Sequence, residues 1–286
     1  MKRVLHPLSK ALAQSAAFDA GDVSAFSSKA DDQLCLAAPT LDQRAPAGFV
    51  RRCHGDLHLA NIVLWHSRPV LYDAIEFDET IATIDTLYDL AFLLMDLDRH
   101  RQRRAANVVF NRYLARSNDD LDLRGLKALP LFLGVRSAVR ALVNAERAAQ
   151  EQNDQARGCA TQAQAYLQSA IGYLSPSQPQ LIAVGGPSGS GKTTLAAALA
   201  PEIGSAPGAI HVRSDLERKV LKAMTIRGAR YIQIHVPCPL GWGSASRDTI
   251  RLARLAVECG LFPIFEAEFG RVTAAPPIRH RIPVSD

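Results

Sequence analysis

Residues 185–194, GGPSGSGKTT, combine glycines, a lysine and hydroxyl side chains at the spacing of a loop that binds phosphate groups. The pattern G-x-x-x-x-G-K-[ST] runs from Gly186 to Thr193, between a strand-like apolar stretch and an alanine-rich stretch typical of a helix. Glycines let successive backbone N–H groups converge on phosphate oxygens, and the amino end of the helix favours negative charge. Lys192 is then placed to contact the β- and γ-phosphates of ATP, while the Thr193 hydroxyl ligates Mg²⁺. The predicted nucleotide-binding residues are Gly186, Ser188, Gly189, Ser190, Gly191, Lys192, Thr193 and Thr194.

A second stretch that could carry chemistry is HGDLHLAN, residues 54–61. Its H-x-D-x-x-x-x-N spacing is that of a phosphotransferase catalytic loop, in which the Asp orients a substrate hydroxyl or accepts its proton. This predicts a catalytic role for Asp56 and a metal-ligating role for Asn61. An acid after the following hairpin would complete the metal site, and both Asp73 and Glu76 are candidates.

A third group of candidates follows the glycine-rich loop. Asp215 and Arg218 come at the carboxyl end of the next predicted strand, 209–215, where ligands bind in open α/β sheets. Asp215 is therefore a candidate to orient an acceptor substrate. It fits equally well as the N-cap of a helix that starts there, and both roles can hold together.

The elements that position these residues change in pattern along the chain. Residues 49–53, 61–65 and 69–77 are typical of short strands, and apolar residues follow helical spacing from about 84 to 174. SPSQPQ, residues 175–180, has the composition of a linker. We therefore expect a weakly structured lead-in with one helical piece at 1–48, a domain at 49–175 and a P-loop domain at 176–286. The stretch 225–247 has no clear period.

HGDLHLAN, the acid after the hairpin and YDLAFLL (88–94), in this order, resemble the aminoglycoside phosphotransferase family over about residues 49–175. The resemblance implies a kinase-like helical C-lobe with a small β-hairpin, and a structural role for Asp89. Asp73 closes an apolar strand, as the family's metal-binding Asp does, whereas IEF resembles the family's IDF and would favour Glu76. We favour Asp73 and leave Glu76 open.

The second half resembles the small-molecule P-loop kinases, a group that contains gluconate and shikimate kinases, zeta toxins and antibiotic phosphotransferases. The resemblance implies that Asp215 orients or deprotonates the acceptor hydroxyl and that Arg218 helps to hold the substrate. The order of the two parts is similar to that of a bacterial two-module protein, an aminoglycoside phosphotransferase-like module fused to a P-loop kinase-like, AAA-family ATPase. The expected fold class is α/β plus mainly α.

The chain also departs from both patterns. Only 48 residues precede the first expected strand, without the glycine-rich loop or V-A-x-K strand of a kinase N-terminal lobe. After Lys192 only 94 residues remain, fewer than a complete P-loop kinase of this kind needs. We therefore expect a chain truncated at both ends, with an incomplete parallel-sheet domain. A reading frame that departs from that of its relatives near residue 220 is a further hypothesis.

Charge, hydrophobicity and cysteine content limit the classes of partner and location that we expect. The formal charge of +5 comes from basic residues spread along the chain, so nucleic acid is not an expected partner. No apolar run reaches the roughly 18 residues of a membrane span, and five scattered cysteines without CxxC spacing fit a reducing cytoplasm. The expected activity is transfer of the ATP γ-phosphoryl group to a small hydroxyl-bearing acceptor. A non-catalytic nucleotide-binding or scaffold protein and a simple ATP hydrolase are the alternatives.

Overall fold

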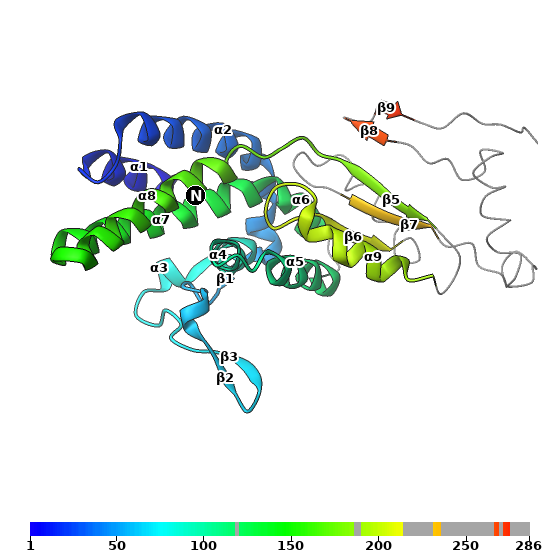
Figure 1. Ribbon diagram of the computed structural model, residues 1–286, viewed down its shortest axis with the longest axis horizontal. Coiled ribbons are helices and arrows are strands. Elements are labelled where there is room, and N and C mark those ends of the chain that lie inside the picture. The colour runs from blue at the N-terminus through cyan, green and yellow to red at the C-terminus, as the bar shows by residue number, and fades with distance from the viewer. Residues whose placement is uncertain (118–119, 186–189, 214–230, 236–265, 269–270, 275–286) are drawn as a thin grey trace, which may run out of the picture. The chain divides into compact units, whose positions relative to one another are not determined.

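The computed structural model describes residues 1–117, 120–185, 190–213, 231–235, 266–268 and 271–274 (Figure 1). The chain divides into two compact units, each with its own contacts. Unit 1 comprises residues 1–177 with 205–207, and unit 2 comprises residues 178–204 and 208–286. In the described part of the chain, no helix is long and apolar enough to cross a membrane.

Unit 1 begins with two helices, α1 (Lys2–Gln14) and α2 (Ala20–Arg44). Asp19 caps α2, because its carboxylate accepts hydrogen bonds from the backbone N–H groups of Gly21 and Asp22. The expectation of a weakly structured segment at 1–48 is therefore wrong. The helical period of α2 was hard to recognise because much of its buried stripe consists of small residues. The buried residues of α2 are Val23, Phe26, Ala30, Leu34, Ala37, Thr40 and Arg44.

Five further helices build most of the remaining core of unit 1. These are α4 (Thr86–Arg99), α5 (Arg103–Ser117), α6 (Asp120–Gly125), α7 (Leu129–Gln150) and α8 (Asn153–Tyr173). Helices α7 and α8 pack side by side, with α2 against one side of the pair and α4 against the other (Figure 1). Helix α4 is buried at every position from Leu87 to Leu97, so it is the central helix of the unit. Between α6 and α7 the chain makes one 3₁₀ turn, Leu126–Ala128.

Two small antiparallel sheets lie on this helical body. Strand β1 (Val50–Arg52) pairs with β4 (Thr83–Asp85), and β2 (Ile62–Trp65) pairs with β3 (Arg68–Leu71). A π-helical turn (Ala45–Phe49), a 3₁₀ turn (Leu59–Asn61) and the short helix α3 (Glu79–Ala82) connect them. The predicted strand at 69–77 is shorter than expected. It ends at Leu71, and two residues later Asp73 adopts a left-handed conformation, with φ of 59°, that an extended strand cannot contain.

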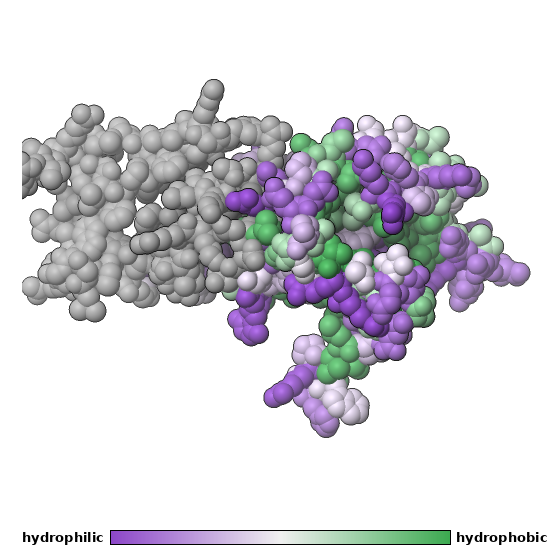
Figure 2. Space-filling view, turned by 180° about the vertical axis from the view of Figure 1, so that it is seen from behind, coloured by the Kyte–Doolittle hydropathy of each residue, from purple (hydrophilic) through white to green (hydrophobic). Residues whose placement is uncertain are grey.

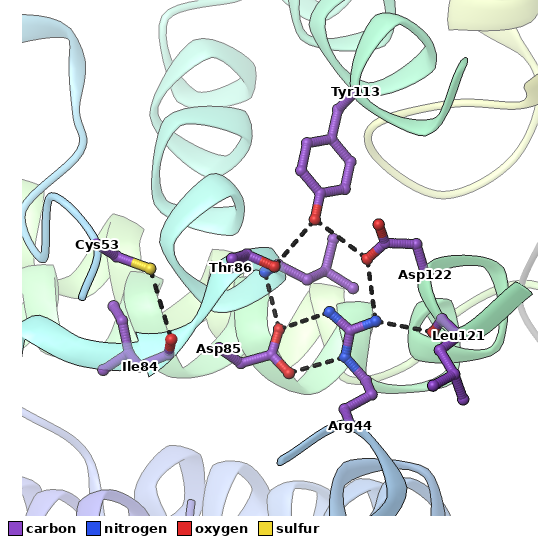
Figure 3. Close-up of polar contacts among 9 residues, drawn as sticks. Arg44, Cys53, Ile84, Asp85, Thr86, Tyr113, Leu121 and Asp122 are labelled. Atoms are coloured by element: carbon purple, nitrogen blue, oxygen red, sulfur yellow. Dashed lines mark hydrogen bonds and ion pairs between the residues drawn. The ribbon is translucent and has the colours of Figure 1, made fainter. Parts of the chain in front are cut away.

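A buried arginine ties α2 to the strand β4 that leads into the central helix (Figure 3). The Arg44 guanidinium bonds both carboxylate oxygens of Asp85 at 2.8 Å and one of Asp122 at 3.0 Å. The guanidinium also lies 4.0 Å from the centre of the Phe49 ring. Burial by itself lowers the pKa of Arg44, but the hydrogen bonds and charges of the two aspartates raise it above its usual value. The arginine therefore stays charged inside the protein.

Unit 2 contains a three-stranded parallel sheet in the order β5-β7-β6. Its strands are β5 (Leu181–Gly185), β6 (Ile210–Arg213) and β7 (Tyr231–His235), and helix α9 (Lys192–Leu199) follows β5. A 3₁₀ turn (Ala200–Glu202) extends α9, and β8 (Glu266–Glu268) pairs antiparallel with β9 (Arg271–Ala274). The stretch 225–247, in which no period was recognised, therefore contains the central strand of the parallel sheet.

Candidate functional site

The loop that carries HGDLHLAN is held by two carboxylates of helix α4. Asp89 accepts hydrogen bonds from the backbone N–H groups of His54 and Gly55, both at 3.0 Å. Asp96, two turns further along the helix, accepts one from Leu59 N–H at 2.9 Å. These contacts agree with the structural role expected for Asp89. Asp96 was missed, although an aspartate seven residues after Asp89 on an apolar helix marks the same face.

Within this loop the Asp56 carboxylate is held in place through one of its two oxygens, Oδ2. Asn61 Nδ2 donates to Asp56 Oδ2 at 3.1 Å and to the Asp56 backbone oxygen at 2.9 Å. His58 Nε2 lies 3.3 Å from the same Oδ2. Because His58 Nδ1 accepts the Ala60 N–H at 3.2 Å, a neutral His58 carries its proton on Nε2 and donates it to Asp56. Among the described residues, the other carboxylate oxygen of Asp56 has no hydrogen-bond partner, which leaves it available to a substrate.

Asp56 lines a hollow of about 660 Å³, and the two acids proposed as metal ligands, Asp73 and Glu76, line it too. The lining residues are Asp56, Asp73, Ala74, Ile75, Glu76 and Phe77. Hydrogen bonds between Ile75 N–H and the His54 carbonyl, 2.9 Å, and between Tyr72 N–H and the Asn61 carbonyl, 3.1 Å, hold this segment beside the loop. The left-handed backbone of Asp73 is rare for a residue other than glycine, and such conformations gather at functional sites.

The acids that line this hollow, and the neighbouring Asn61, which does not line it, have oxygen atoms that suit a hard cation, but they do not form a complete metal site. Asn61 uses its amide nitrogen on Asp56, so its oxygen is left for a ligand, and carboxylate and amide oxygens are what Mg²⁺ prefers. In the part of the chain that the structure describes, no group of three or more His, Cys, Asp or Glu side chains is arranged to hold a metal ion. Asn61, Asp73 and Glu76 therefore remain predicted ligands, and the choice between the two acids stays open.

The glycine-rich loop of unit 2 is described over its carboxyl half. Gly191 has a φ of 81° and is the N-cap residue of α9, a conformation that favours glycine. Lys192 is only 7% exposed, and its ammonium lies 3.4 Å from the Oγ of Ser190, two residues earlier in the chain. Burial lowers the pKa of Lys192. Thr193 and Thr194 are exposed, so their hydroxyls are open to a ligand or metal ion.

The remaining predicted site residues lie outside the described residues. They are Gly186, Ser188, Gly189, Asp215 and Arg218. Of the predicted residues that are described, unit 1 holds Asp56, Asn61, Asp73 and Glu76, and unit 2 holds the loop residues from Ser190 to Thr194. Lys192 at the amino end of α9, after a strand of a parallel sheet, has the local setting in which a P-loop lysine contacts phosphate.

Residues 163–229 match the Zeta toxin family, a P-loop nucleotide-binding, kinase-like family. The match spans the glycine-rich loop, strand β6, Asp215 and Arg218. It supports a P-loop kinase-like, nucleotide-binding module in this part of the chain. The aminoglycoside phosphotransferase-like character of residues 49–175 remains a prediction.

Curated relatives of two kinds match the chain. Pyruvate synthase subunit PorB of Methanocaldococcus jannaschii is 45% identical over 76 residues, 26% of this chain and 26% of that subunit. Ketoisovalerate oxidoreductase subunit VorB of Pyrococcus abyssi is 42% identical over 67 residues, 23% of this chain and 22% of that subunit. An uncharacterized protein of Mycobacterium tuberculosis is 27% identical over 235 residues, 79% of this chain and 44% of that protein.

The chain thus spans about a quarter of the first two relatives and less than half of the third. No solved structure matches it.

Proposed function

We propose that this protein transfers the γ-phosphoryl group of ATP to a small hydroxyl-bearing acceptor, with the glycine-rich loop of unit 2 as its nucleotide site. The main support is the buried Lys192 at the amino end of α9, whose ammonium lies 3.4 Å from Ser190 Oγ. Burial lowers the pKa of Lys192, because a less polar setting disfavours the charged ammonium. Triphosphate oxygens beside the ammonium would offset this effect.

The proposed chemistry requires positioning and charge neutralisation rather than a covalent intermediate. Lys192 would contact the β- and γ-phosphates, and the exposed hydroxyl of Thr193 would ligate Mg²⁺. The cation, when bound, would screen the charge that the γ-phosphoryl group carries during in-line transfer. Asp215 would orient the acceptor hydroxyl and take its proton, and Arg218 would hold the acceptor. These last two roles rest on the sequence resemblance.

The described geometry also favours a second candidate site, at Asp56. One oxygen of this carboxylate is fixed by Asn61 and His58, and the other has no described partner beside a hollow lined by further acids. This is the arrangement that a proton acceptor for a substrate hydroxyl needs. We nevertheless place ATP binding in unit 2, because the family match lies there.

The activities in the names of the pyruvate synthase and ketoisovalerate oxidoreductase relatives are not part of this proposal. The matched stretches are about a quarter of each subunit and so represent a small part of those proteins. A cytoplasmic location and the lack of a nucleic-acid partner do belong to the proposal. They rest on the scattered cysteines and the spread of basic residues along the chain.

A titration of Mg·ATP into four proteins tests the nucleotide site. These are the wild type, Lys192→Ala, Asp56→Ala and, as a matched control, Lys10→Ala, which removes an exposed lysine of α1. We expect Lys192→Ala to abolish ATP binding and both other variants to bind as the wild type does. Equal binding by Lys192→Ala would remove the P-loop assignment, and loss of binding in Asp56→Ala would move the nucleotide to unit 1.

The same proteins separate the proposed kinase from its alternatives. Transfer of labelled γ-phosphate to members of a panel of small alcohols and amino sugars, dependent on Lys192, supports a phosphotransferase. Phosphate release that no acceptor changes would indicate an ATP hydrolase. Binding without release or transfer would indicate a nucleotide-binding scaffold.

A further inference from the structure

The β2–β3 hairpin of unit 1 exposes apolar side chains on both of its faces. It projects from the helical body (Figure 1), and hydrophobic side chains cover part of the projection, while its outer end is more polar (Figure 2). Leu64 is 75% exposed and Trp65 65% exposed, and the neighbouring exposed apolar residues of the two strands are Val63, Val70 and Leu71. Among the described residues, these two strands pair only with each other. A two-stranded hairpin of this kind is marginally stable in water without further cover.

The turn shows which backbone groups of the hairpin face outward. His66 and Ser67 both have positive φ, 47° and 59°, the signature of a two-residue type I′ turn. Such a turn is closed by a hydrogen-bonded pair, here Trp65 and Arg68, so the next pair along must be non-hydrogen-bonded. That next pair is Leu64 opposite Pro69, and its backbone groups therefore point away from the hairpin.

The two outer edges of the hairpin differ in chemistry. On the β3 edge, Pro69 has no N–H to offer and Arg68 adds a charge, two devices that prevent a strand from pairing further. On the β2 edge, Leu64 presents both its N–H and its carbonyl group. The Ile62 N–H is already bonded to the Leu59 carbonyl, which leaves the Ile62 carbonyl as a further acceptor. Near the turn, the β2 edge is thus more open to another strand than the β3 edge is.

We propose that strand β2 pairs with strand β2 of a second copy of this chain, antiparallel, about a twofold axis at Leu64. The two Leu64 residues would exchange their outward N–H and carbonyl groups in two backbone hydrogen bonds. In this register Val63 lies opposite Trp65 of the partner, and the contact occurs twice because the interface is symmetric. The result is a four-stranded sheet, β3-β2-β2-β3, in which the apolar side chains nearest the axis pack beside those of the second copy on each face.

The charge pattern favours a second copy as the occupant. Residues 61–65, NIVLW, carry no charge, so the strand meets its own copy without the like-charge repulsion that disfavours most self-pairing edges. The register also places a β-branched residue against an aromatic one, a favourable cross-strand combination. A different protein would need a complementary strand of its own, whereas the second copy supplies one already matched.

Sedimentation velocity over the micromolar range tests the dimer in the full chain. We expect the wild type to dimerise and Leu64→Lys to weaken dimerisation by about tenfold or more, because two ammonium groups would meet at the axis. Val108→Lys, at an exposed apolar residue of α5, is the matched control and should dimerise as the wild type does. Because Leu64 is so exposed, its replacement should leave the helical circular dichroism unchanged.

A cysteine at the axis gives an independent measurement. Under oxidation Leu64→Cys should form a covalent dimer well above the background of the five native cysteines, while Val108→Cys should not. A monomeric wild type, equal dimerisation of both lysine variants, or equal cross-linking of both cysteine variants would each overturn the proposal. So would a wild-type monomer that binds phosphatidylserine vesicles through Leu64, since a lipid surface would then cover the hairpin.

Discussion

The buried arginine of unit 1 allows a prediction whose size follows from the structure. Arg44→Met keeps most of the apolar stem of the side chain but removes the cation between Asp85 and Asp122 (Figure 3). Both carboxylates are buried, so neither can turn to water when the guanidinium is gone. The hydrogen bond that the Leu121 carbonyl accepts from the guanidinium at 2.7 Å is lost as well. The variant therefore leaves buried polar atoms without partners at the junction of α2, β4 and α6.

Breaking a buried ion pair by removal of one partner costs about 3–5 kcal/mol of unfolding free energy. Unit 1 also offers an exposed pair of the same chemical type, Arg52 with Glu79 at 2.6 Å, in which both side chains are more than half exposed. An exposed pair contributes about 0–1 kcal/mol. We therefore expect Arg44→Met to lower stability by at least about 2 kcal/mol more than Arg52→Met does.

Urea unfolding followed by far-UV circular dichroism measures this difference, because most of the described helices belong to unit 1. With an m-value of about 2 kcal/mol/M, the midpoint of Arg44→Met should fall by about 2 M, and that of Arg52→Met by less than about 0.5 M. Adding Asp85→Asn and Asp122→Asn should recover part of the loss, because the stranded charges are then removed. Equal midpoints for the two single variants would refute the reasoning.

Three further predictions concern single residues. Gly55→Ala should destabilise unit 1 by about 1–3 kcal/mol in urea unfolding, because Gly55 has a φ of 84° and a Cβ there would lie 2.9 Å from an isoleucine side chain. Gly158→Ala is the control, because a Cβ at this position of α8 would meet open space. It should instead stabilise the unit by up to about 1 kcal/mol. ATP affinity should fall as pH rises, because deprotonation removes the charge with which Lys192 attracts phosphate. Since burial lowers the pKa of Lys192, the fall should begin below the pH at which an ordinary lysine, with a pKa of 10.5, loses its proton. An affinity that stays constant up to that pH would contradict this prediction. Burial, with the nearby charge of an aspartate, raises the pKa of Cys53 to about 11. In maleimide labelling followed by peptide mass spectrometry, the exposed Cys35 should therefore react well before Cys53.

Local sequence patterns predicted those parts of the fold that depend on neighbours along the chain. The 61–65 strand and the helix after the glycine-rich loop were predicted from patterns that lie within one hairpin or one motif. The structural role of Asp89 came instead from the family resemblance, because its contacts with His54 and Gly55 cross 35 and 34 residues of chain. The family match adds support for the P-loop module, while the kinase-like assignment of residues 49–175 stays a prediction.

The sequence by itself predicted two candidate sites for phosphate chemistry, because a glycine-rich loop and an H-x-D-x-x-x-x-N loop encode their backbone shapes in consecutive residues. Only the tertiary structure decided which side chains support them. Arg44 was an ordinary arginine in the sequence, yet it meets Asp85 and Asp122 across 41 and 78 residues of chain. Such contacts depend on how α2, β4 and α6 pack, and on a buried environment that only the folded core provides.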